Sequence, residues 1–228
     1  MSDDFRKKTE GLHIGIIPDG NRRYAQKKKL PVANGHIIGS EKIKDFTKWC
    51  LDYPEVKQIT IFALSTENLR RTEEEIEQLW KVYKEKFNEI LIDPVIRDHN
   101  VKVRILGNDG VWKPNIRELA RNVVNSTKNY SKHIVNIMLA YGSKFEIADA
   151  VRKMANKPLG TLEKFLLVKE PLDLVIRTGG QYRLSNFMLY QASYAEIYFS
   201  KTLWPEFSRK EFDKIMDWYY EQVRKWGR

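Results

Sequence analysis

Short apolar runs alternate along the chain with longer stretches in which apolar residues recur at helical spacing. Short runs bounded by turn residues are typical of strands that are buried on both faces. Six strands are therefore predicted, at His13–Ile17, Gln58–Leu64, Val101–Leu106, Ile134–Leu139, Leu172–Ile176 and Glu196–Phe199. Strands that alternate with helices predict an α/β fold whose central, mostly parallel six-stranded sheet is flanked by helices on both faces.

Three predicted helix starts carry a hydroxyl residue followed three positions later by a glutamate. This spacing lets the hydroxyl accept from a free backbone amide of the first helical turn and lets the glutamate accept from the amide of the hydroxyl residue. The pairs are Thr72 with Glu75, Ser143 with Glu146, and Ser208 with Glu211. No repeat, low-complexity tract or linker interrupts the pattern, so residues 1–228 are predicted to form a single domain.

The composition excludes several classes of protein. With 228 residues, 42% of them hydrophobic, the chain is long enough for a core that needs no disulfide or metal. Its single cysteine, Cys50, excludes an intrachain disulfide and a zinc site built from several cysteines. No apolar run approaches the ~20 residues of a membrane span, and the first residues lack the apolar segment of a signal peptide. We expect a cytoplasmic protein.

The formal net charge of +10 favours an anionic partner such as nucleic acid, anionic lipid or a phosphorylated small molecule. The basic residues are spread along the chain and mixed with acidic ones, which is the usual pattern of a solvated helix surface. A nucleic-acid-binding protein would carry a basic stripe or an aromatic platform, and the sequence contains no recognised module of that kind. We expect no nucleic-acid partner.

Ligands of open parallel sheets bind where strands end at their carboxyl edge, so the residues after each strand carry the most information. The first strand runs into Pro18-Asp19-Gly20-Asn21-Arg22-Arg23. Backbone amides at such a turn and two guanidinium groups suit phosphate oxygens, and a carboxylate suits a metal ion. The alternative is a turn whose Asp and Asn satisfy local backbone groups. The segment lacks the Lys-Ser/Thr ending of a P-loop.

Two further strand ends are rich in polar and basic residues. The second strand is followed by Ser65-Thr66-Glu67-Asn68-Leu69-Arg70-Arg71, and the fifth by Arg177-Thr178-Gly179-Gly180, with Arg183 and Ser185 close behind. Helix capping explains part of the first segment, and a loop with solvated arginines is the alternative for the second. Glycines that admit a close ligand, arginines and a hydroxyl nevertheless favour a second phosphate site.

Two isolated residues each have a structural and a functional interpretation. Glu196 lies among apolar neighbours, so it either faces solvent or pairs with an arginine or a metal near Asp19. His36 stands alone and is more typical of a surface or helix-start position than of a catalyst. No Ser/His/Asp set, His-x-x-x-His pair or dinucleotide-binding glycine fingerprint is present, which disfavours hydrolases, zinc proteases and dehydrogenases.

Taken together, four segments resemble blocks of the cis-prenyltransferase family, the undecaprenyl diphosphate synthase group, in family order. They are HIGIIPDGNRRYA, GHIIG, ALSTENLRR and DLVIRTGGQYRLSNFMLYQASYAEIYFSKTLWPEF. The resemblance extends over essentially the whole chain, and the segment PDGNRR is similar to that of archaeal members. It implies a sheet that encloses an apolar tunnel, a homodimer, and a Mg2+-dependent condensation of isopentenyl diphosphate with an allylic diphosphate to give a cis-polyprenyl diphosphate.

The resemblance assigns roles residue by residue. It implies catalytic roles for Asp19, Ser65 and Asn68, the asparagine helping to remove the proton. The implied allylic diphosphate site comprises Gly20, Asn21, Arg22, Arg23, Tyr24, His36, Glu67, Leu69 and Arg71. The implied isopentenyl diphosphate site comprises Arg177, Arg183, Leu184 and Ser185. The implied metal ligands are Asp19 and Glu196, the latter supplied across a dimer.

The chain departs from the family pattern at four positions. Arg22 replaces a small residue, Val32 replaces a diphosphate-binding arginine whose charge Arg22 would supply, and Leu69 replaces a frequent aromatic residue. Near the carboxyl end, Lys225 begins a weakened form of the family's Arg-x-Gly tail. These departures leave open an enzyme that makes an irregular linkage between two allylic units. A non-catalytic subunit of a heteromeric enzyme is the other alternative, although the metal aspartate and the implied isopentenyl arginines are present.

Two predicted helices carry the bulky side chains expected beside the tunnel. Their residues are Ile43, Phe46 and Cys50 on one helix, and Leu79, Trp80, Tyr83 and Phe87 on the other. Ordinary core packing is the alternative. If Phe46 and Trp80 project into the tunnel, they stop elongation early and the product is short or medium in length. A hydrocarbon product also makes peripheral membrane contact plausible, although no amphipathic anchor stands out.

Overall fold

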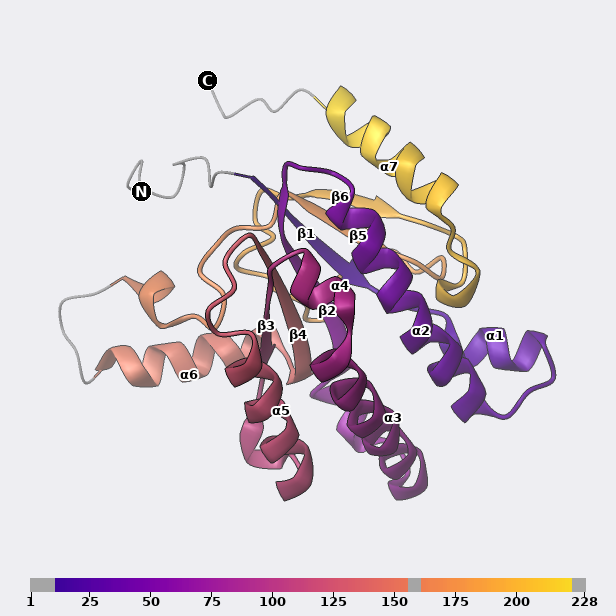
Figure 1. The fold of residues 1–228 in the computed structure, drawn as a ribbon, viewed down its shortest axis with the longest axis horizontal. Coiled ribbons are helices and arrows are strands. Elements are labelled where there is room, and N and C mark those ends of the chain that lie inside the picture. The colour runs from indigo at the N-terminus through magenta and orange to yellow at the C-terminus, as the bar shows by residue number, and fades with distance from the viewer. Residues whose placement is uncertain (1–10, 156–160, 223–228) are drawn as a thin grey trace.

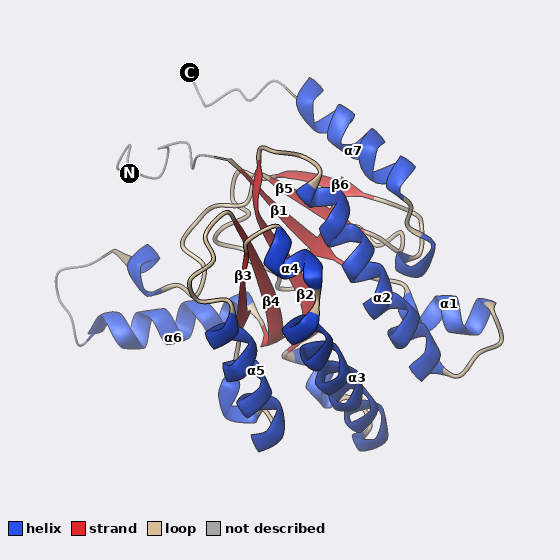
Figure 2. Cartoon of the chain, viewed as in Figure 1, coloured by secondary structure: helices blue, strands red, loops and turns tan. Residues whose placement is uncertain are grey.

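The computed structural model describes residues 11–155 and 161–222, whose strands form one six-stranded sheet (Figures 1 and 2). The strand order is β3-β4-β2-β1-β5-β6, and all five neighbouring pairs are parallel. The strands are β1 (Leu12–Ile17), β2 (Val56–Ser65), β3 (Val101–Leu106), β4 (His133–Tyr141), β5 (Leu174–Arg177) and β6 (Glu196–Phe199). All six predicted strands are confirmed, and the sheet is wholly parallel. The fifth strand starts later than expected and includes Arg177 as its last residue.

Helices cover both faces of the sheet, as the alternation predicts (Figure 1). The helices are α1 (Asn21–Lys27), α2 (Val32–Leu51), α3 (Glu73–Ile92), α4 (Pro94–Asp98), α5 (Pro114–Ser126), α6 (Ser143–Ala155) and α7 (Arg209–Glu221). Short 3-10 turns occupy Glu67–Arg70, Asp109–Val111, Leu162–Phe165 and Trp204–Glu206. The larger hydrophobic cluster joins α2, α3, α5 and α7 to one face of the sheet, and the smaller lies on the other face.

Side chains of the central strand alternate between the two clusters. Ile14 and Ile16 belong to the larger cluster and Ile17 to the smaller one, because successive residues of a strand point to opposite faces. Gly15 faces the smaller cluster, where a Cβ atom would lie 2.9 Å from the ring of Phe187. The absence of a side chain at this position therefore lets the loop that follows β5 pack directly against the sheet.

Two of the three predicted helix caps are confirmed. The hydroxyl of Thr72 accepts from the amide of Glu75 at 3.3 Å, and that of Ser208 accepts from the amide of Glu211 at 3.3 Å. The prediction for Ser143 is wrong, because its hydroxyl accepts from the amide of Leu189 instead.

Helix α6 is capped by a residue from a distant loop. The amide of Ser143 donates to the carbonyl of Asn186 at 2.8 Å, and the amide of Lys144 donates to the side-chain oxygen of Asn186 at 2.9 Å. Glu146 is buried, and its carboxylate accepts from the Tyr141 hydroxyl and from the backbone amide of Leu167 at 2.8 Å. A tertiary contact has thus replaced the local capping box.

A chain of hydrogen bonds crosses the buried middle of the sheet. Asn136 donates to the hydroxyl of Thr60 at 2.9 Å, and Thr60 lies 2.7 Å from Nε2 of His13. Nδ1 of His13 lies 2.9 Å from the carbonyl oxygen of Pro171, which can only accept. The network therefore assigns the proton to Nδ1 and makes Nε2 the acceptor of the Thr60 hydroxyl. A neutral His13 satisfies both contacts.

This network predicts a pH-dependent loss of stability. Burial, opposed in part by the hydrogen bond to Pro171, lowers the pKa of His13 from 6.5 to about 4. The unfolded chain therefore binds the proton more readily, so His13 costs stability as the pH falls from 6.5 toward 4. Between pH 7 and pH 5 this amounts to about 2 kcal/mol. Urea unfolding at both pH values should show that His13→Gln loses about 2 kcal/mol less than the native chain. Equal losses would contradict a neutral buried His13.

Candidate active site

Three chemically rich loops meet at the carboxyl edge of the sheet, beyond the ends of β1, β2 and β5. The first begins at Asp19 and turns at Gly20, which has φ +117°. A Cβ atom at Gly20 would also lie 3.0 Å from Leu203, so both backbone conformation and packing favour glycine there. The turn leads directly into α1 and places Arg23 one helical turn after Asp19.

Asp19 lies between two arginines. Its Oδ1 atom is 3.0 Å from Arg23 and its Oδ2 atom is 2.8 Å from Arg177, whose side chain is only 4% exposed. The hydroxyl of Thr178 donates to the backbone carbonyl of Asp19 at 2.8 Å. Gly179 has φ +83°, and a Cβ atom there would lie 2.5 Å from the guanidinium of Arg23. Thr178 and the following glycine thus let the loops after β1 and β5 touch around one carboxylate.

Arg177 also organises the loop that follows its own strand. Its guanidinium donates to the hydroxyl of Ser185 at 2.8 Å and to the backbone carbonyl of Arg183. The side chain of Arg183 is exposed and donates to Gln181 at 2.8 Å, while Leu184 packs against the smaller hydrophobic cluster. The loop therefore carries one fixed cation, one exposed cation and a hydroxyl group.

The loop after β2 folds around Ser65 and Asn68. The hydroxyl of Ser65 accepts from the amide of Asn68 at 3.1 Å, and the side-chain oxygen of Asn68 accepts from the amide of Ser65 at 3.4 Å. Burial disfavours the charged form of Glu67, but hydrogen bonds from Asn186, Thr66 and Ser65 outweigh it and lower its pKa. Glu67 is therefore an ionised acceptor at neutral pH.

The glycines of GHIIG bring α2 close to α1. A Cβ atom at Gly35 would lie 2.3 Å from the carbonyl of Asn21, and one at Gly39 would lie 2.1 Å from its side-chain oxygen. The side-chain amide of Asn21 donates to the carbonyl of Pro18 at 3.4 Å, which steadies the turn before α1. Tyr24 is half-buried on α1, with the ammonium group of Lys28 at 5.9 Å from its ring centre. These contacts give Asn21 and the glycines a structural role.

His36, Arg71 and Val32 line a small pocket between α2 and α3. Burial and the positive charge of Arg71, with a further effect of Arg22, lower the pKa of His36 to about 4. Arg22 forms an ion pair with Glu75 at 3.5 Å. The pocket therefore combines a neutral imidazole with the Arg71 cation and the Glu75 carboxylate, and Arg22 contacts it through the ion pair with Glu75.

Leu69 and the tail complete the predicted set. Leu69 is half-buried against the larger hydrophobic cluster, so it contributes to packing under the loop after β2. Lys225-Trp226-Gly227 lies outside the described residues.

Glu196 is not brought to this cluster within one chain. It begins β6 and pairs with Leu174 at the start of β5, whereas Arg177 pairs with Phe199 at the other end of the two strands. At ~3.3 Å per residue, three residues of strand separate these ends by about 10 Å. Asp19 and Glu196 therefore do not form one metal site in a single chain.

The donor set at the edge fits a magnesium ion only in part. Within residues 11–155 and 161–222, no three side chains of His, Cys, Asp or Glu converge as a metal site would require. Mg2+ is commonly held by one or two carboxylates together with substrate phosphates and water. Asp19 supplies one carboxylate, and its side chain is 29% exposed. The chemistry of the site thus suits a magnesium ion that arrives with a diphosphate.

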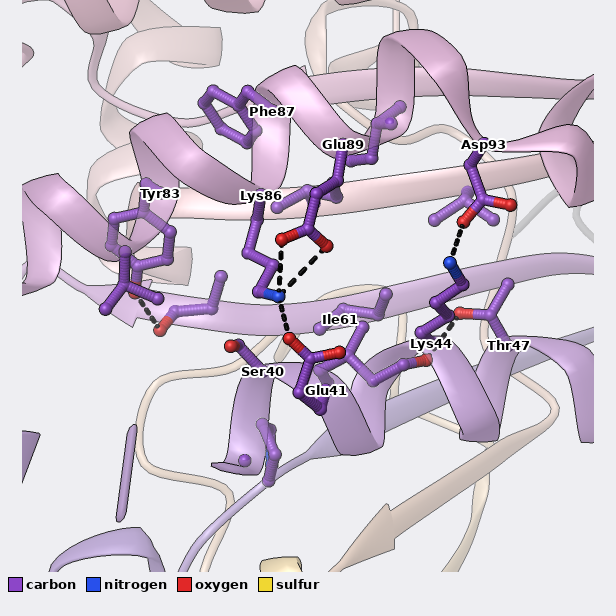
Figure 3. Close-up of a pocket in the computed structure, with 18 of the residues that line it drawn as sticks. Ser40, Glu41, Lys44, Thr47, Ile61, Tyr83, Lys86, Phe87, Glu89 and Asp93 are labelled. Carbon is purple, nitrogen blue, oxygen red and sulfur yellow. Dashed lines mark hydrogen bonds and ion pairs between the residues drawn. The ribbon is translucent and has the colours of Figure 1, made fainter. Parts of the chain in front are cut away.

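A cavity lies between α2, α3 and the sheet (Figure 3). Its empty volume is about 1160 Å³, open mouth included. Apolar residues of β2, β3, β4 and α3 form most of the wall, and Pro18, Asn21 and His36 connect it to the cluster at the edge. Ile43, Leu79, Tyr83 and Phe87 line this space as predicted.

Three of the predicted lining residues do not line the cavity. Phe46 points away from it and packs against Trp204 and Phe212, with ring centres 5.7 and 5.3 Å apart. Trp80 and Cys50 are buried but absent from the cavity wall. These three side chains are ordinary core, because they lie on other faces of α2 and α3. The hypothesis that Phe46 and Trp80 limit elongation is therefore not supported.

Two ion pairs bridge the helices over the cavity. Lys86 contacts Glu41 and lies 2.9 Å from Glu89, and Lys44 lies 2.8 Å from Asp93 (Figure 3). All five side chains line the cavity. The wall formed by the sheet is thus apolar, whereas the seam between α2 and α3 is charged. No local sequence pattern predicts this seam, because its residues come from segments far apart in the chain.

The arrangement defines an enzyme class before any relative is considered. A parallel α/β sheet carries a carboxylate and several arginines at its carboxyl edge, and this edge opens into an apolar cavity. Such a site suits a transferase whose substrates combine phosphate groups with a hydrocarbon chain. No helix among the described residues is long and apolar enough to cross a membrane.

Comparisons with known proteins identify the family. The model of the family described as "Putative undecaprenyl diphosphate synthase" matches residues 17–227. A tritrans,polycis-undecaprenyl-diphosphate synthase (geranylgeranyl-diphosphate specific) of Pyrococcus furiosus is 37% identical over 230 residues, 95% of this chain and 86% of the relative. The protein of the same name from Pyrobaculum aerophilum is also 37% identical, with 95% of both chains covered. The chain belongs to this family and is a prenyltransferase.

Solved structures agree with this assignment. A probable undecaprenyl diphosphate synthase from Campylobacter jejuni matches with a TM-score of 0.82 and 30% identity, over 96% of this chain and all of the other. A lavandulyl diphosphate synthase from Lavandula x intermedia, in complex with dimethylallyl diphosphate, matches with a TM-score of 0.91 and 25% identity, over 96% and 99%. The family resemblance inferred from the four sequence segments is confirmed.

Proposed function

We propose that the chain is a Mg2+-dependent cis-prenyltransferase that condenses isopentenyl diphosphate with an allylic prenyl diphosphate. The observation that carries the proposal is the position of Asp19, which lies between Arg23 on one loop and Arg177 on another, 3.0 and 2.8 Å away. Two cation-bearing loops thus meet at one carboxylate beside the mouth of an apolar cavity. This is the arrangement that two diphosphates and one growing hydrocarbon require.

The printed names of the relatives suggest the primer and the product. The Pyrococcus and Pyrobaculum proteins are named as specific for geranylgeranyl diphosphate and as undecaprenyl diphosphate synthases. We propose geranylgeranyl diphosphate as the primer and a medium-length product such as undecaprenyl diphosphate. The allylic diphosphate would lie against Arg23, Arg22 and Arg71, and isopentenyl diphosphate against Arg177 and Arg183.

The allylic half of the reaction depends on stabilising a leaving diphosphate. A Mg2+ ion held by Asp19 and diphosphate oxygens would supply Lewis-acid stabilisation of that charge. Arg23, which is 42% exposed on the side chain, supplies hydrogen bonds and positive charge from the first turn of α1. Its contact with Asp19 keeps the guanidinium aimed at the edge of the sheet.

The isopentenyl half depends on orientation. Arg177 is fixed by Asp19 and Ser185, so a diphosphate bound to it and to Arg183 is held in one direction. Holding two reactants at near-contact distance is worth several orders of magnitude in rate. The side chain of Asn68, oriented by Ser65, is the proposed group that helps to remove the proton.

A dimer would supply the second carboxylate. Because Glu196 lies at the opposite edge of the sheet from Arg177, we propose that it acts on the site of a second copy. A homodimer is therefore part of the proposal. We also propose a cytoplasmic enzyme that touches the membrane peripherally, since a polyprenyl product must pass into lipid.

Product analysis tests the proposal directly. The purified chain is incubated with Mg2+, labelled isopentenyl diphosphate and geranylgeranyl diphosphate, and products are resolved by mass spectrometry. The expected result is a ladder of added five-carbon units that chelator abolishes and restored Mg2+ returns. If the same series of products formed at the same rate in the presence of chelator, the proposed role of the metal would be contradicted. Absence of any product with all components present would favour a non-catalytic subunit.

The cavity predicts which residues limit product length. Tyr83 and Phe87 line the cavity from α3, whereas Phe46 is absent from its wall and packs against Trp204. Tyr83→Ala and Phe87→Ala should therefore shift the product distribution toward longer chains, because each enlarges the space for the hydrocarbon. Phe46→Ala is the matched control and should leave the distribution unchanged. If only Phe46→Ala lengthened the products, the growing hydrocarbon would have to occupy a space other than this cavity.

An irregular coupling of two allylic units is the second candidate. It is favoured by the TM-score of 0.91 with a lavandulyl diphosphate synthase. In the same assay, incubation with dimethylallyl diphosphate alone would then give a ten-carbon diphosphate without isopentenyl carbon. We favour the regular reaction because the relatives at 37% identity carry names of chain-elongating enzymes.

A further inference from the structure

Asn186 lies in a loop with an unusual backbone. Ser185, Asn186 and Met188 have φ values of 50°, 65° and 40°, which residues other than glycine rarely adopt. Residues in such conformations persist only where surrounding contacts fix them, and they cluster at functional sites. The loop directly follows the residues assigned to isopentenyl diphosphate. Contacts with neighbouring segments must therefore hold this conformation.

Asn186 joins three loops of the sheet edge through separate atoms. Its side-chain nitrogen donates to Oε1 of Glu67 at 2.9 Å, on the loop after β2. Its side-chain oxygen and its carbonyl accept from the first amides of α6, which follows β4. Asn186 itself belongs to the loop after β5. One side chain thus ties together segments that are more than forty residues apart in sequence.

The surroundings of Asn186 leave little room for a different arrangement. A Cβ atom at Gly142 would lie 2.6 Å from the side-chain nitrogen of Asn186 and 2.6 Å from the hydroxyl of Thr66. The amide of Thr66 donates to the carbonyl of Tyr141 at 2.9 Å. The loop after β2 is therefore pressed against the junction between β4 and α6, with Asn186 between them.

The link to Glu67 connects two parts of the proposed site. On one side, Ser185 precedes Asn186 and accepts from the guanidinium of Arg177 at 2.8 Å. On the other, Glu67 precedes Asn68. We propose that Asn186 is a positioning residue that holds the isopentenyl diphosphate loop at a fixed distance from the condensing loop, and thereby aligns the two reactants. This inference rests on the proposed function.

Two roles of Asn186 use different atoms and are separable. The contacts to α6 need an acceptor oxygen, whereas the contact to Glu67 needs a donor nitrogen. Aspartate keeps the acceptor, tolerates the same positive φ and suits a helix amino terminus. Asn186→Asp therefore preserves the cap of α6 but places a second carboxylate against Glu67. The like charges repel and the two loops lose their tie.

Steady-state kinetics with the full chain test the inference. For Asn186→Asp, kcat is expected to fall by about tenfold to a hundredfold, the scale of a small misalignment of reactants. The fall should be larger in kcat than in the KM of either diphosphate, because Arg23 and Arg177 are held by Gly179, Asp19 and Ser185 rather than by Asn186. In the double variant Asn186→Asp with Glu67→Gln, the side-chain amide at position 67 can donate to the carboxylate at position 186, which reverses the native direction of this hydrogen bond. The double variant should therefore be more active than Asn186→Asp alone. An undiminished kcat in Asn186→Asp, or a double variant no better than it, would overturn the proposal.

Amide hydrogen exchange gives a second readout that requires no turnover. The amides of residues 65–71 should exchange faster in Asn186→Asp and return toward the native rate in the double variant. Unchanged exchange in that segment would also overturn the proposal. The two proposals fail in different ways. If the proposed function is wrong, the native chain incorporates no isopentenyl carbon. The exchange measurement needs no turnover, so it still tests whether Asn186 holds the two loops together.

Discussion

Replacing Asp19 with asparagine is expected to lower kcat by at least about 10³-fold. Asp19 is the proposed magnesium ligand, and its two oxygen atoms contact Arg23 and Arg177 at 3.0 and 2.8 Å. Asparagine has nearly the same shape but carries no charge, so the proposed metal ion and both arginines lose their common anionic partner. Incorporation of labelled isopentenyl diphosphate with saturating substrates and Mg2+ measures the effect.

A matched control separates this effect from general electrostatic damage. Asp149 on α6 forms a 2.6 Å ion pair with Lys153 in the same helix, away from the site. Asp149→Asn removes the same charge and should leave kcat within about twofold, because an exposed pair of this kind contributes little. Activity of Asp19→Asn within tenfold of the native chain would remove Asp19 from the catalytic role.

Replacing Arg177 with lysine is expected to damage both activity and stability. Arg177 is 4% exposed and donates to Asp19, Ser185 and the carbonyl of Arg183. Lysine cannot reproduce this planar set of donors and leaves part of a buried network unpaired. We expect kcat/KM for isopentenyl diphosphate to fall by about 10²-fold and the free energy of unfolding to fall by about 3 kcal/mol. Kinetics and urea unfolding measure the two effects separately.

Arg183→Lys provides the comparison. Its side chain is exposed and donates to Gln181, so the same substitution leaves no buried partner unpaired. We expect a higher KM for isopentenyl diphosphate, because a bidentate contact is lost, but an unchanged unfolding midpoint. Equal stability losses in the two variants would contradict the structural account of Arg177.

The sequence predicted the sheet well because each strand carries its own signal. Apolar runs such as Val101–Leu106 are too short for helices and are bounded by turns, so local pattern determines them. The caps at Thr72 and Ser208 are equally local, since both partners lie within one turn. The cap at Ser143 failed because the amide of Glu146 donates to the carbonyl of Gly142, and the hydroxyl of Ser143 accepts from Leu189, more than forty residues away. Local rules hold until a distant residue offers a better contact.

The candidate site divides in the same way. The rule that strand ends gather ligands indicated Asp19, Ser65 and Arg177 from the sequence, and the fold brings the first and third into direct contact. Glu196 shows the limit of that rule, because the register of β5 and β6 places it at the other edge. Its assignment depended on resemblance, and a sequence without a strand register cannot say to which edge a residue belongs.

The sequence by itself determined the family, the order of strands and helices, and the residue types at the strand ends, since these are encoded in short segments. Only the tertiary structure decided which faces of α2 and α3 line the cavity, and therefore that Tyr83 and not Phe46 meets it. The same holds for the ion pairs across the seam and for the contact between Asn186 and Glu67. Each depends on the relative placement of elements distant in sequence, which packing of the whole core sets and no local pattern records.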